Sequence, residues 1–187
     1  MPALETSIFT KLKSDYTEYP NFVETGTFLG QTIYVVEPFF KNLYTVEIKE
    51  EFYSQHISKY TGTKIKFFLG DSGKVLKDII PTISGKTIFF LDGHYSAGIT
   101  GKGDKHVPLY EELEQIVSLF KEKAVIIIDD FRLFGTGPNK NGDVCDWEDI
   151  NLMNVVKIVN DRIENKYTLP STLAKHDRLI LHLKEIT

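Results

Sequence analysis

Short apolar runs alternate with amphipathic segments over most of the chain. The runs are rich in Val, Ile, Leu and Phe and occupy residues 22–24, 42–47, 65–69, 87–91 and 124–128. Between them, apolar residues recur at the spacing of a helix face in residues 32–40, 52–60, 75–83, 109–120 and 152–163. Strands that alternate with helices predict an α/β fold with a doubly wound, mostly parallel sheet.

The two ends of the chain depart from this alternation. Residues 167–170 and 178–183 are strand-like and are separated only by a turn, which predicts an antiparallel hairpin at the C-terminal edge of the sheet. Residues 1–20 form a short polar lead-in. We expect residues 1–187 to make a single domain, since domains commonly contain about 100–200 residues.

The first apolar run leads into a glycine turn. Residues 22–30 read Phe-Val-Glu-Thr-Gly-Thr-Phe-Leu-Gly, which predicts a strand, a tight turn and a helix that begins near Gly30. Glycine at position 26 allows a positive φ and a close approach to a ligand, and such turns are the usual ligand position in open α/β sheets. The glycine spacing differs from the Gly-x-Gly-x-x-Gly turn that binds a pyrophosphate, and the preceding acid favours a cationic ligand. A connector without a ligand is the alternative interpretation.

Acidic residues follow four of the predicted strands: Glu24, Glu47, Asp92, and Asp129 with Asp130. Because the carboxyl ends of parallel strands share one edge of the sheet, we expect these carboxylates to gather over one crevice. Gathering like charges is unfavourable unless cations offset them. Carboxylate oxygens suit a hard cation such as Mg²⁺, so the pattern predicts a metal site at Asp92, Asp129 and Asp130.

Composition narrows the classes of partner. The net charge of −4 and the scattered lysines disfavour nucleic acid. The single cysteine indicates a reducing compartment, and no apolar run is long enough to span a membrane. The N-terminus lacks the basic and apolar regions of a signal peptide. We therefore expect a soluble cytoplasmic protein without a membrane partner.

At the acid-glycine turn the sequence resembles the class I S-adenosylmethionine-dependent methyltransferases, which have a Rossmann-like fold. Within that class it is most similar to the metal-dependent macrocin-type sugar O-methyltransferases, which show Asp-Gly after strand four and Asp-Asp-Tyr or Asp-Asp-Phe after strand five. This chain has Asp92-Gly93 and Asp129-Asp130-Phe131 at those positions. The resemblance covers residues 20–131, and it departs at His94, where the sugar family usually has an acid.

The resemblance implies a set of cofactor contacts. In methyltransferases the acid after strand two binds the ribose, and the segment after strand three contacts the adenine. For Glu47 the alternative is a solvated carboxylate, and for Asp71 and Ser72 it is a helix cap. The implied contacts with S-adenosylmethionine are Glu24, Thr25, Gly26, Thr27, Phe28, Gly30, Glu47, Ile48, Gly70, Asp71, Ser72 and Asp92.

Methyl transfer needs an aligned nucleophile and a group that removes its proton. His94 is the best candidate for the base because it titrates near neutrality and lies two residues after Asp92, the proposed catalytic and metal acid. A loop histidine bonded to backbone is the alternative. Tyr95, His106 and Arg132 are the candidate substrate contacts, although a surface role for His106 and an acid partner for Arg132 are also consistent with the sequence.

These features predict an enzyme that transfers a methyl group from S-adenosylmethionine to a hydroxyl of a sugar or glycan, with Mg²⁺ or a similar divalent ion. The alternatives are a catechol-like or other small-molecule O-methyltransferase and an inactive methyltransferase-like binding module. An NAD-dependent oxidoreductase fits less well because of the glycine spacing. The short lead-in suggests an open site, or a homodimer that covers its own pocket.

Overall fold

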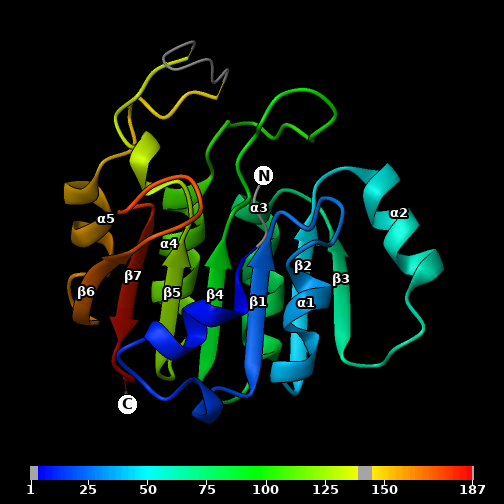
Figure 1. Ribbon diagram of the computed structural model, residues 1–187, viewed down its shortest axis with the longest axis horizontal. Helices are drawn as coiled ribbons and strands as arrows, with labels where there is room; N and C mark the ends of the chain where they lie inside the picture. The colour runs from blue at the N-terminus through cyan, green and yellow to red at the C-terminus, as the bar shows by residue number, and fades with distance from the viewer. Residues whose placement is uncertain (1–3, 139–144, 187) are drawn as a thin grey trace.

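The computed structural model describes residues 4–138 and 145–186, which form one seven-stranded sheet with helices on both faces (Figure 1). The strand order is β3-β2-β1-β4-β5-β7-β6. Every neighbouring pair from β3 to β5 is parallel, whereas β7 runs antiparallel to both β5 and β6. The strands are β1 (Asn21–Thr25), β2 (Asn42–Glu47), β3 (Ile65–Leu69), β4 (Thr87–Leu91), β5 (Ala124–Ile128), β6 (Ile163–Leu169) and β7 (Arg178–Leu183). The predicted fold class and the C-terminal hairpin are confirmed.

The helices form two layers that enclose the sheet. The helices that pack on one face are α3 (Ser72–Ile79), α4 (Leu109–Leu119) and α5 (Leu152–Val159). The other face is covered by the 3-10 helix η1 (Thr6–Lys11) and by α1 (Ile33–Val36), while α2 (Glu50–Lys59) lies beyond β3 at the end of the sheet (Figure 1). Short 3-10 helices complete the set: η2 (Tyr16–Glu18), η3 (Glu37–Phe39), η4 (Ile80–Thr82) and η5 (Phe131–Leu133).

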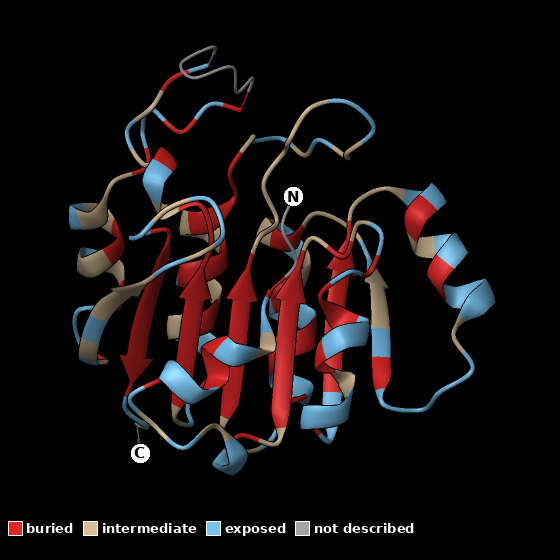
Figure 2. Ribbon diagram, viewed as in Figure 1, coloured by how far each residue is buried: buried red, intermediate tan, exposed pale blue. Residues whose placement is uncertain are grey.

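The central strands are buried along their length, as Figure 2 shows. All residues of β1, β4, β5 and β7 are buried, which is the pattern of strands covered on both faces. Strands β3 and β6 form the two edges of the sheet and are more exposed, with Ile65 the one buried residue of these two strands. The lead-in contributes Ile8 and Phe9 to the core, so it closes one face of the sheet.

The register of the parallel strands aligns their carboxyl ends. Thr25 pairs with Val46 on one side and with Leu91 on the other, and Leu91 pairs with Ile128. The residues that follow these positions therefore emerge at one edge. In Figure 1 this is the upper edge, above which the loops after β4 and β5 rise.

Two helices differ from the predicted pattern. Helix α1 begins at Ile33 and ends at Val36, so it starts later and is shorter than the helix predicted to begin near Gly30 and to include residues 32–40. The chain continues as η3 because Pro38 cannot extend an α-helix. Helix α5 ends at Val159, and Ile163, which the spacing placed on its face, begins β6.

Among the described residues, no helix has both the length and the apolar character to traverse a lipid bilayer.

The buried side chain of Arg162 fastens the hairpin to the rest of the sheet. Its guanidinium donates hydrogen bonds to the carbonyl oxygens of Phe120, Glu122 and Lys184, the last two at 2.8 Å. The side chain lies between the end of α4 and the end of β7, where those carbonyls have no ladder partner. One guanidinium fork satisfies several buried acceptors at once.

We expect Arg162→Ala to lower the free energy of unfolding by about 3 kcal/mol, because it removes a buried side chain and leaves the buried carbonyl oxygen of Phe120 and two partly buried ones unpaired. Urea denaturation measures the loss. The matched control is Lys157→Ala on the exposed side of α5, which we expect to change stability by less than about 0.5 kcal/mol. Equal losses in the two variants would contradict the structural role of Arg162.

Candidate functional site

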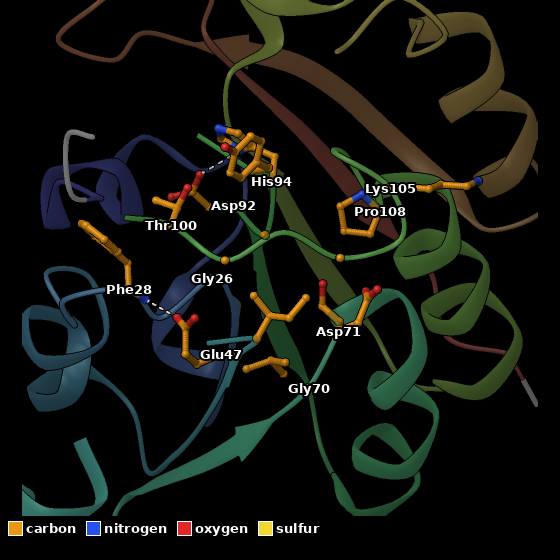
Figure 3. A pocket seen from close by; sticks show the side chains of 17 residues that line it. Gly26, Phe28, Glu47, Gly70, Asp71, Asp92, His94, Thr100, Lys105 and Pro108 are labelled. Carbon is orange, nitrogen blue, oxygen red and sulfur yellow. Dashed lines mark hydrogen bonds and ion pairs between the residues drawn. The ribbon is translucent and has the colours of Figure 1, made fainter. Parts of the chain in front are cut away.

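A pocket opens at the carboxyl edge of the sheet, where the loops after β1, β2, β3 and β4 meet (Figure 3). Eight of the predicted cofactor contacts line it: Gly26, Phe28, Glu47, Ile48, Gly70, Asp71, Ser72 and Asp92. His94 and Tyr95 line it as well. The structure thus gathers into one pocket residues that lie far apart in sequence.

Glycine is required at position 26, where the predicted positive φ is confirmed and where the structure adds a second reason. Gly26 has φ +85°, and a Cβ atom there would lie 2.5 Å from the carbonyl oxygen of Asp92. The absent side chain therefore allows the turn after β1 to approach the end of β4 closely. The second glycine, Gly30, also has a positive φ, but it packs beside Tyr34 and His56, outside the pocket lining.

The carboxylate of Glu47 is held by backbone donors at the pocket wall. Its Oε2 accepts from the N–H of Phe28 and its Oε1 from the N–H of Lys49, both at 2.7 Å (Figure 3 shows the first bond). Each carboxylate oxygen retains acceptor capacity after one such bond. Glu47 is therefore fixed in place with room to accept hydrogen bonds from a diol.

Asp71 caps a helix and also lies in the wall of the pocket. Its Oδ1 accepts from the N–H of Gly73 at 3.0 Å and caps α3, and the residue also lines the pocket. Ser72 lines the pocket too, but its hydroxyl is turned inward to a buried carboxylate, Glu112 on α4, at 2.5 Å. The segment after β3 is thus held rigidly at the pocket edge.

The glycine-rich loop after β4, residues 96–107, forms the roof of this pocket and is called the roof loop below. Gly101 lies directly against the side chain of Ile48, and a Cβ atom on Gly103 would be 2.5 Å from Oδ2 of Asp71. The Nζ atom of Lys49 donates to the carbonyl oxygen of Ile99 at 2.8 Å. The loop therefore covers the side of the pocket formed by the loops after β2 and β3.

Three of the predicted contacts in and before the turn do not line the pocket. Glu24 is buried and accepts a hydrogen bond from the hydroxyl of Thr45, its partner across β2, at 2.7 Å. The Thr27 hydroxyl lies 2.6 Å from the same Thr45 oxygen, and the Thr25 hydroxyl accepts from the N–H of Asp92 at 3.2 Å. These side chains stabilise the turn from behind rather than face a ligand.

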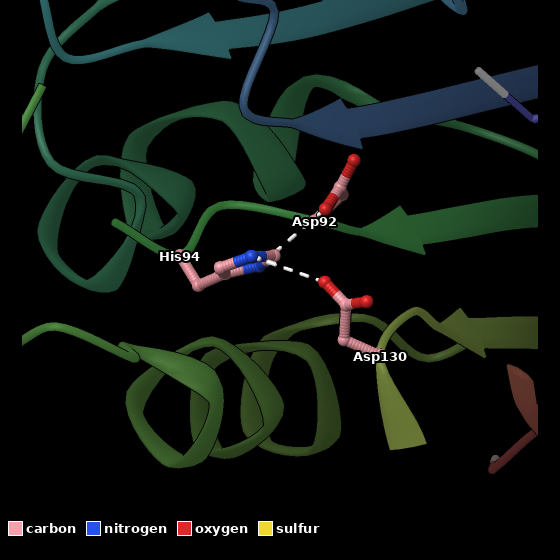
Figure 4. Close-up of side chains that lie close together, drawn as sticks. All are labelled: Asp92, His94 and Asp130. Carbon is pink, nitrogen blue, oxygen red and sulfur yellow. Dashed lines mark ion pairs between the residues drawn. The ribbon is translucent and has the colours of Figure 1, made fainter. Parts of the chain in front are cut away.

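Asp92, His94 and Asp130 converge at the end of the pocket nearest β5 (Figure 4). The His94 Nδ1 atom is 3.4 Å from Asp92 Oδ1, and its Nε2 atom is 3.0 Å from Asp130 Oδ2. One potential ligand atom from each of the three lies within 4.8 Å of the others. The Asp92 Oδ1 atom is buried and lacks a hydrogen bond in the part of the chain that the structure describes.

Asp129, the third predicted metal ligand, is turned away from this cluster. Its Oδ1 lies 3.3 Å from Nε of Arg178, a fully buried residue at the start of β7. Asp129 belongs instead to a second group of acids, with Asp130 and Asp177. Arg132 bonds Asp130 and Asp177, so the acid partner considered for this residue is the one observed, and Arg132 is not part of the pocket lining.

Burial dominates the electrostatics of these acids. It raises the pKa of Asp92 well above the ordinary value, and the neighbouring Asp129 and Asp130 raise it further. It also raises the pKa of Asp129 to about 6, although the guanidinium of Arg178 opposes the shift. The pKa of Glu24 rises to about 8 for the same reason. Burial at this edge of the sheet therefore favours the neutral forms of these carboxyl groups.

The remaining candidate substrate contacts lie in and beside the roof loop. The Tyr95 N–H donates to the His106 carbonyl at 2.8 Å, and their rings meet edge to face. His106 accepts from the N–H of Asp146 at its Nδ1 atom, so it joins the two long loops rather than lining the pocket. Tyr95 keeps its predicted place in the lining.

Two charged residues inside apolar elements, Glu112 and Arg178, were not predicted to be part of the site. Glu112 lies on the face of α4 formed by Leu109, Leu113 and Ile116, so an acid at a core position of a helix was the signal that marked it. Arg178 begins a buried strand, in which a charged residue needs a partner.

We expect the free energy of unfolding to fall as the pH rises from about 4.5 to about 8, with Glu24 as one contributor. The folded protein holds the Glu24 proton to a higher pH than the unfolded chain does, so the unfolded state is favoured as that proton is lost. Glu24→Gln should remove the contribution of Glu24 and so weaken the dependence of the free energy of unfolding on pH. Urea denaturation at several pH values tests this, with the exposed Glu114→Gln as control. Parallel curves for Glu24→Gln and the unmodified protein would contradict it.

No protein-family model matches the sequence, and no curated protein matches it. Solved structures do. The N-methyltransferase NodS from Bradyrhizobium japonicum WM9 is similar at 11% identity over 97% of this chain and 94% of that chain, with a TM-score of 0.58. An S-adenosylmethionine-dependent methyltransferase from Clostridium acetobutylicum ATCC 824 is similar at 13% identity over 97% of each chain, with a TM-score of 0.51.

The magnesium protoporphyrin IX methyltransferase ChlM from Synechocystis PCC 6803, in a structure with bound SAH, is similar at 13% identity over 96% of this chain and 81% of that chain, with a TM-score of 0.56. At such identities the likeness establishes the architecture. The chain has the Rossmann-like fold that these methyltransferases share.

Proposed function

We propose that this protein is an S-adenosylmethionine-dependent methyltransferase. The observation that carries the proposal is the alignment of the Gly26 turn, Glu47, Asp71 and Asp92 around one pocket at the carboxyl edge of the sheet. The strand order supports it, because dinucleotide-binding sheets have the order 3-2-1-4-5-6, whereas here an antiparallel β7 lies between β5 and β6. An NAD-dependent oxidoreductase is correspondingly disfavoured.

The lining residues suit the parts of this cofactor. Glu47, fixed by two backbone N–H groups, is positioned to accept hydrogen bonds from the ribose diol. Ile48 and the capped segment at Asp71 offer an apolar wall and a polar edge for the adenine. The buried acids favour a positively charged sulfonium. When bound, the cofactor supplies a methyl group activated by that sulfonium.

The cluster at the β5 end fits a divalent cation held by Asp92 and Asp130. Asp92 Oδ1 is a buried acceptor without a hydrogen bond in the described chain, and two carboxylates suit a hard ion that keeps waters and substrate oxygens. Asp129 is left out of the proposed ligand set because it lies outside the group formed by Asp92, His94 and Asp130 and its carboxylate pairs with Arg178. When bound, such an ion lowers the pKa of a hydroxyl and fixes its orientation.

His94 is placed to take the proton of the acceptor hydroxyl. Its ring lies between the two carboxylates, which stabilise the imidazolium that forms when a nitrogen accepts a proton. Trp147 packs edge to face against the ring, with centroids 4.9 Å apart, and holds its orientation. The base, the proposed cation site and the cofactor pocket are thus adjacent.

A hydroxyl of a sugar or glycan is the acceptor we propose. The support is the match to the sugar-modifying branch at Asp92-Gly93 and Asp129-Asp130-Phe131, together with the polar character of the roof loop beside Tyr95. The solved neighbours include an N-methyltransferase and a porphyrin methyltransferase by name, so they do not narrow the acceptor. Catechols are the comparison class for the assay.

We expect calorimetry to detect binding of S-adenosylmethionine to the unmodified protein. Titration with Mn²⁺ should detect one bound ion, and the affinity for that ion should fall at least about tenfold in Asp92→Asn, because a charged ligand is lost. Asp104→Asn, which alters an exposed acid paired with Lys74, is the control. Binding of NAD in place of S-adenosylmethionine would overturn the proposal. Cofactor binding without metal binding would retire the metal site alone.

We expect His94→Ala to lower the rate of methyl transfer by about 10²–10⁴-fold, because the acceptor proton loses its base, with cofactor affinity unchanged. The assay follows labelled methyl groups from S-adenosylmethionine onto a panel of monosaccharides and glycans, with catechols in parallel. His176→Ala, on the exposed side of the hairpin loop, serves as control. A loss of Mn²⁺ affinity in His94→Ala would make this residue a metal ligand instead, and cofactor binding without transfer by the unmodified protein would indicate a binding module.

A further inference from the structure

Glu112 is a buried acid that does not line the cofactor pocket. It lies in the first turn of α4, on the helix face that packs against the sheet, and is 2% exposed. Burying an acid in an apolar layer is unfavourable unless it accepts hydrogen bonds. The position would be filled more stably by an apolar residue if packing were its only task.

The carboxylate of Glu112 meets the ends of three strands. The Ser72 hydroxyl, after β3, donates to Oε1 at 2.5 Å. The Thr25 hydroxyl, at the end of β1, is a second hydrogen-bond neighbour. Gly93, after β4, approaches so closely that a Cβ atom there would lie 2.9 Å from Oε1.

The direction of the side chains explains this convergence. Side chains alternate between the faces of a strand, and Val23 belongs to the core shared with α3 and α4. Thr25 therefore points to the same face, where Glu112 lies. Burial raises the pKa of Glu112 to about 7, and the bonds from Ser72 and Thr25 oppose that rise, as they do when they stabilise a carboxylate.

Each of these contacts is next to a residue of the pocket. Thr25 precedes Gly26, Ser72 follows Asp71, and Gly93 follows Asp92. Thr25 also accepts the backbone N–H of Asp92, so the β1 and β4 loops are linked on the same side. One carboxylate behind the pocket thus fixes the relative positions of the three loops in front of it.

We propose that Glu112 is a positioning residue that holds the three cofactor-binding loops in register for S-adenosylmethionine, through hydrogen bonds to Ser72 and Thr25 and close packing on Gly93. The inference rests on the proposed function, since it concerns the same pocket. It assigns a role in ligand binding to a side chain that lies outside the pocket lining.

The test compares cofactor affinity with stability in Glu112→Ala and Glu112→Gln. In Glu112→Ala we expect the Kd for S-adenosylmethionine, measured by calorimetry on folded protein, to rise at least about tenfold, because the loops lose their common acceptor. Glu112→Gln keeps the side-chain volume and one carbonyl acceptor, so most of the affinity should return. The control is Glu114→Ala, which alters an exposed acid two residues further along α4 and should bind S-adenosylmethionine as the unmodified protein does.

A residue that only stabilises the fold would lower the melting temperature and leave the Kd of the folded protein unchanged, and that result would overturn the proposal. Equal losses of affinity in Glu112→Gln and Glu112→Ala would overturn it too. If Glu112→Ala does not fold, Thr25→Val carries the test, since Thr25 lies outside the pocket lining: it should raise the Kd of the folded protein for S-adenosylmethionine, and an unchanged Kd would overturn the proposal. Failure of the unmodified protein to bind S-adenosylmethionine would refute the proposed function rather than the role of Glu112.

Discussion

Burial of carboxylates at one edge of the sheet is the constraint on which the rest of the site depends. An ionised acid in a poorly solvated place is costly unless donors or cations surround it. On the β1 and β2 side, hydroxyl and backbone N–H groups are the donors, as at Glu24 and Glu47. On the β5 and β7 side the chain supplies its own cations, since Arg178 pairs with Asp129 and Arg132 binds Asp130. The acids can therefore gather at this edge without unfolding it.

Close backbone approach is the second constraint, and glycine makes it possible. Because Gly26 has no side chain, the end of β4 can pack against the turn after β1. The absence of a side chain at Gly93 likewise allows the carboxylate of Glu112 to approach. Both distances leave no space for a Cβ atom. The glycines are therefore needed first by the protein itself. A ligand then meets loops whose spacing has already been set, which is the preorganisation that binding and transfer reactions require.

The fold could be predicted because the central strands are rich in apolar residues and are followed by polar turns, as in residues 87–91 and 124–128. Glu47, Asp71 and Asp92 could be found for the same reason, since strand ends share one edge. The orientation of a side chain could not be predicted from its position in sequence. Glu47 is the last residue of β2, but Glu24 lies one residue before the end of β1, and its side chain accepts a hydrogen bond from Thr45 on the side of the turn away from the pocket.

Contacts between elements that lie far apart in the sequence could not be predicted from the local sequence pattern either. Asp129 and Asp130 are adjacent, and only the placement of β7 beside β5 brings Arg178 to the first of them. The roof loop is rich in glycine, a composition that by itself suggests mobility. In the structure those glycines serve close packing, because Gly101 and Gly103 lie against Ile48 and Asp71. Composition alone does not distinguish a glycine that confers freedom from one that permits contact.

Asp92 connects the two halves of the site. Its backbone N–H donates to the Thr25 hydroxyl and its carbonyl oxygen lies close to Gly26, so its main chain packs against the turn after β1. Its side chain faces His94 and shares the cluster with Asp130. A displacement of the turn after β1 therefore moves a carboxylate of the proposed reaction centre as well. Because the same residue is held from both sides, the pocket proposed for the methyl donor and the place proposed for the acceptor hydroxyl are mechanically a single unit, and the geometry between them is set before either ligand binds.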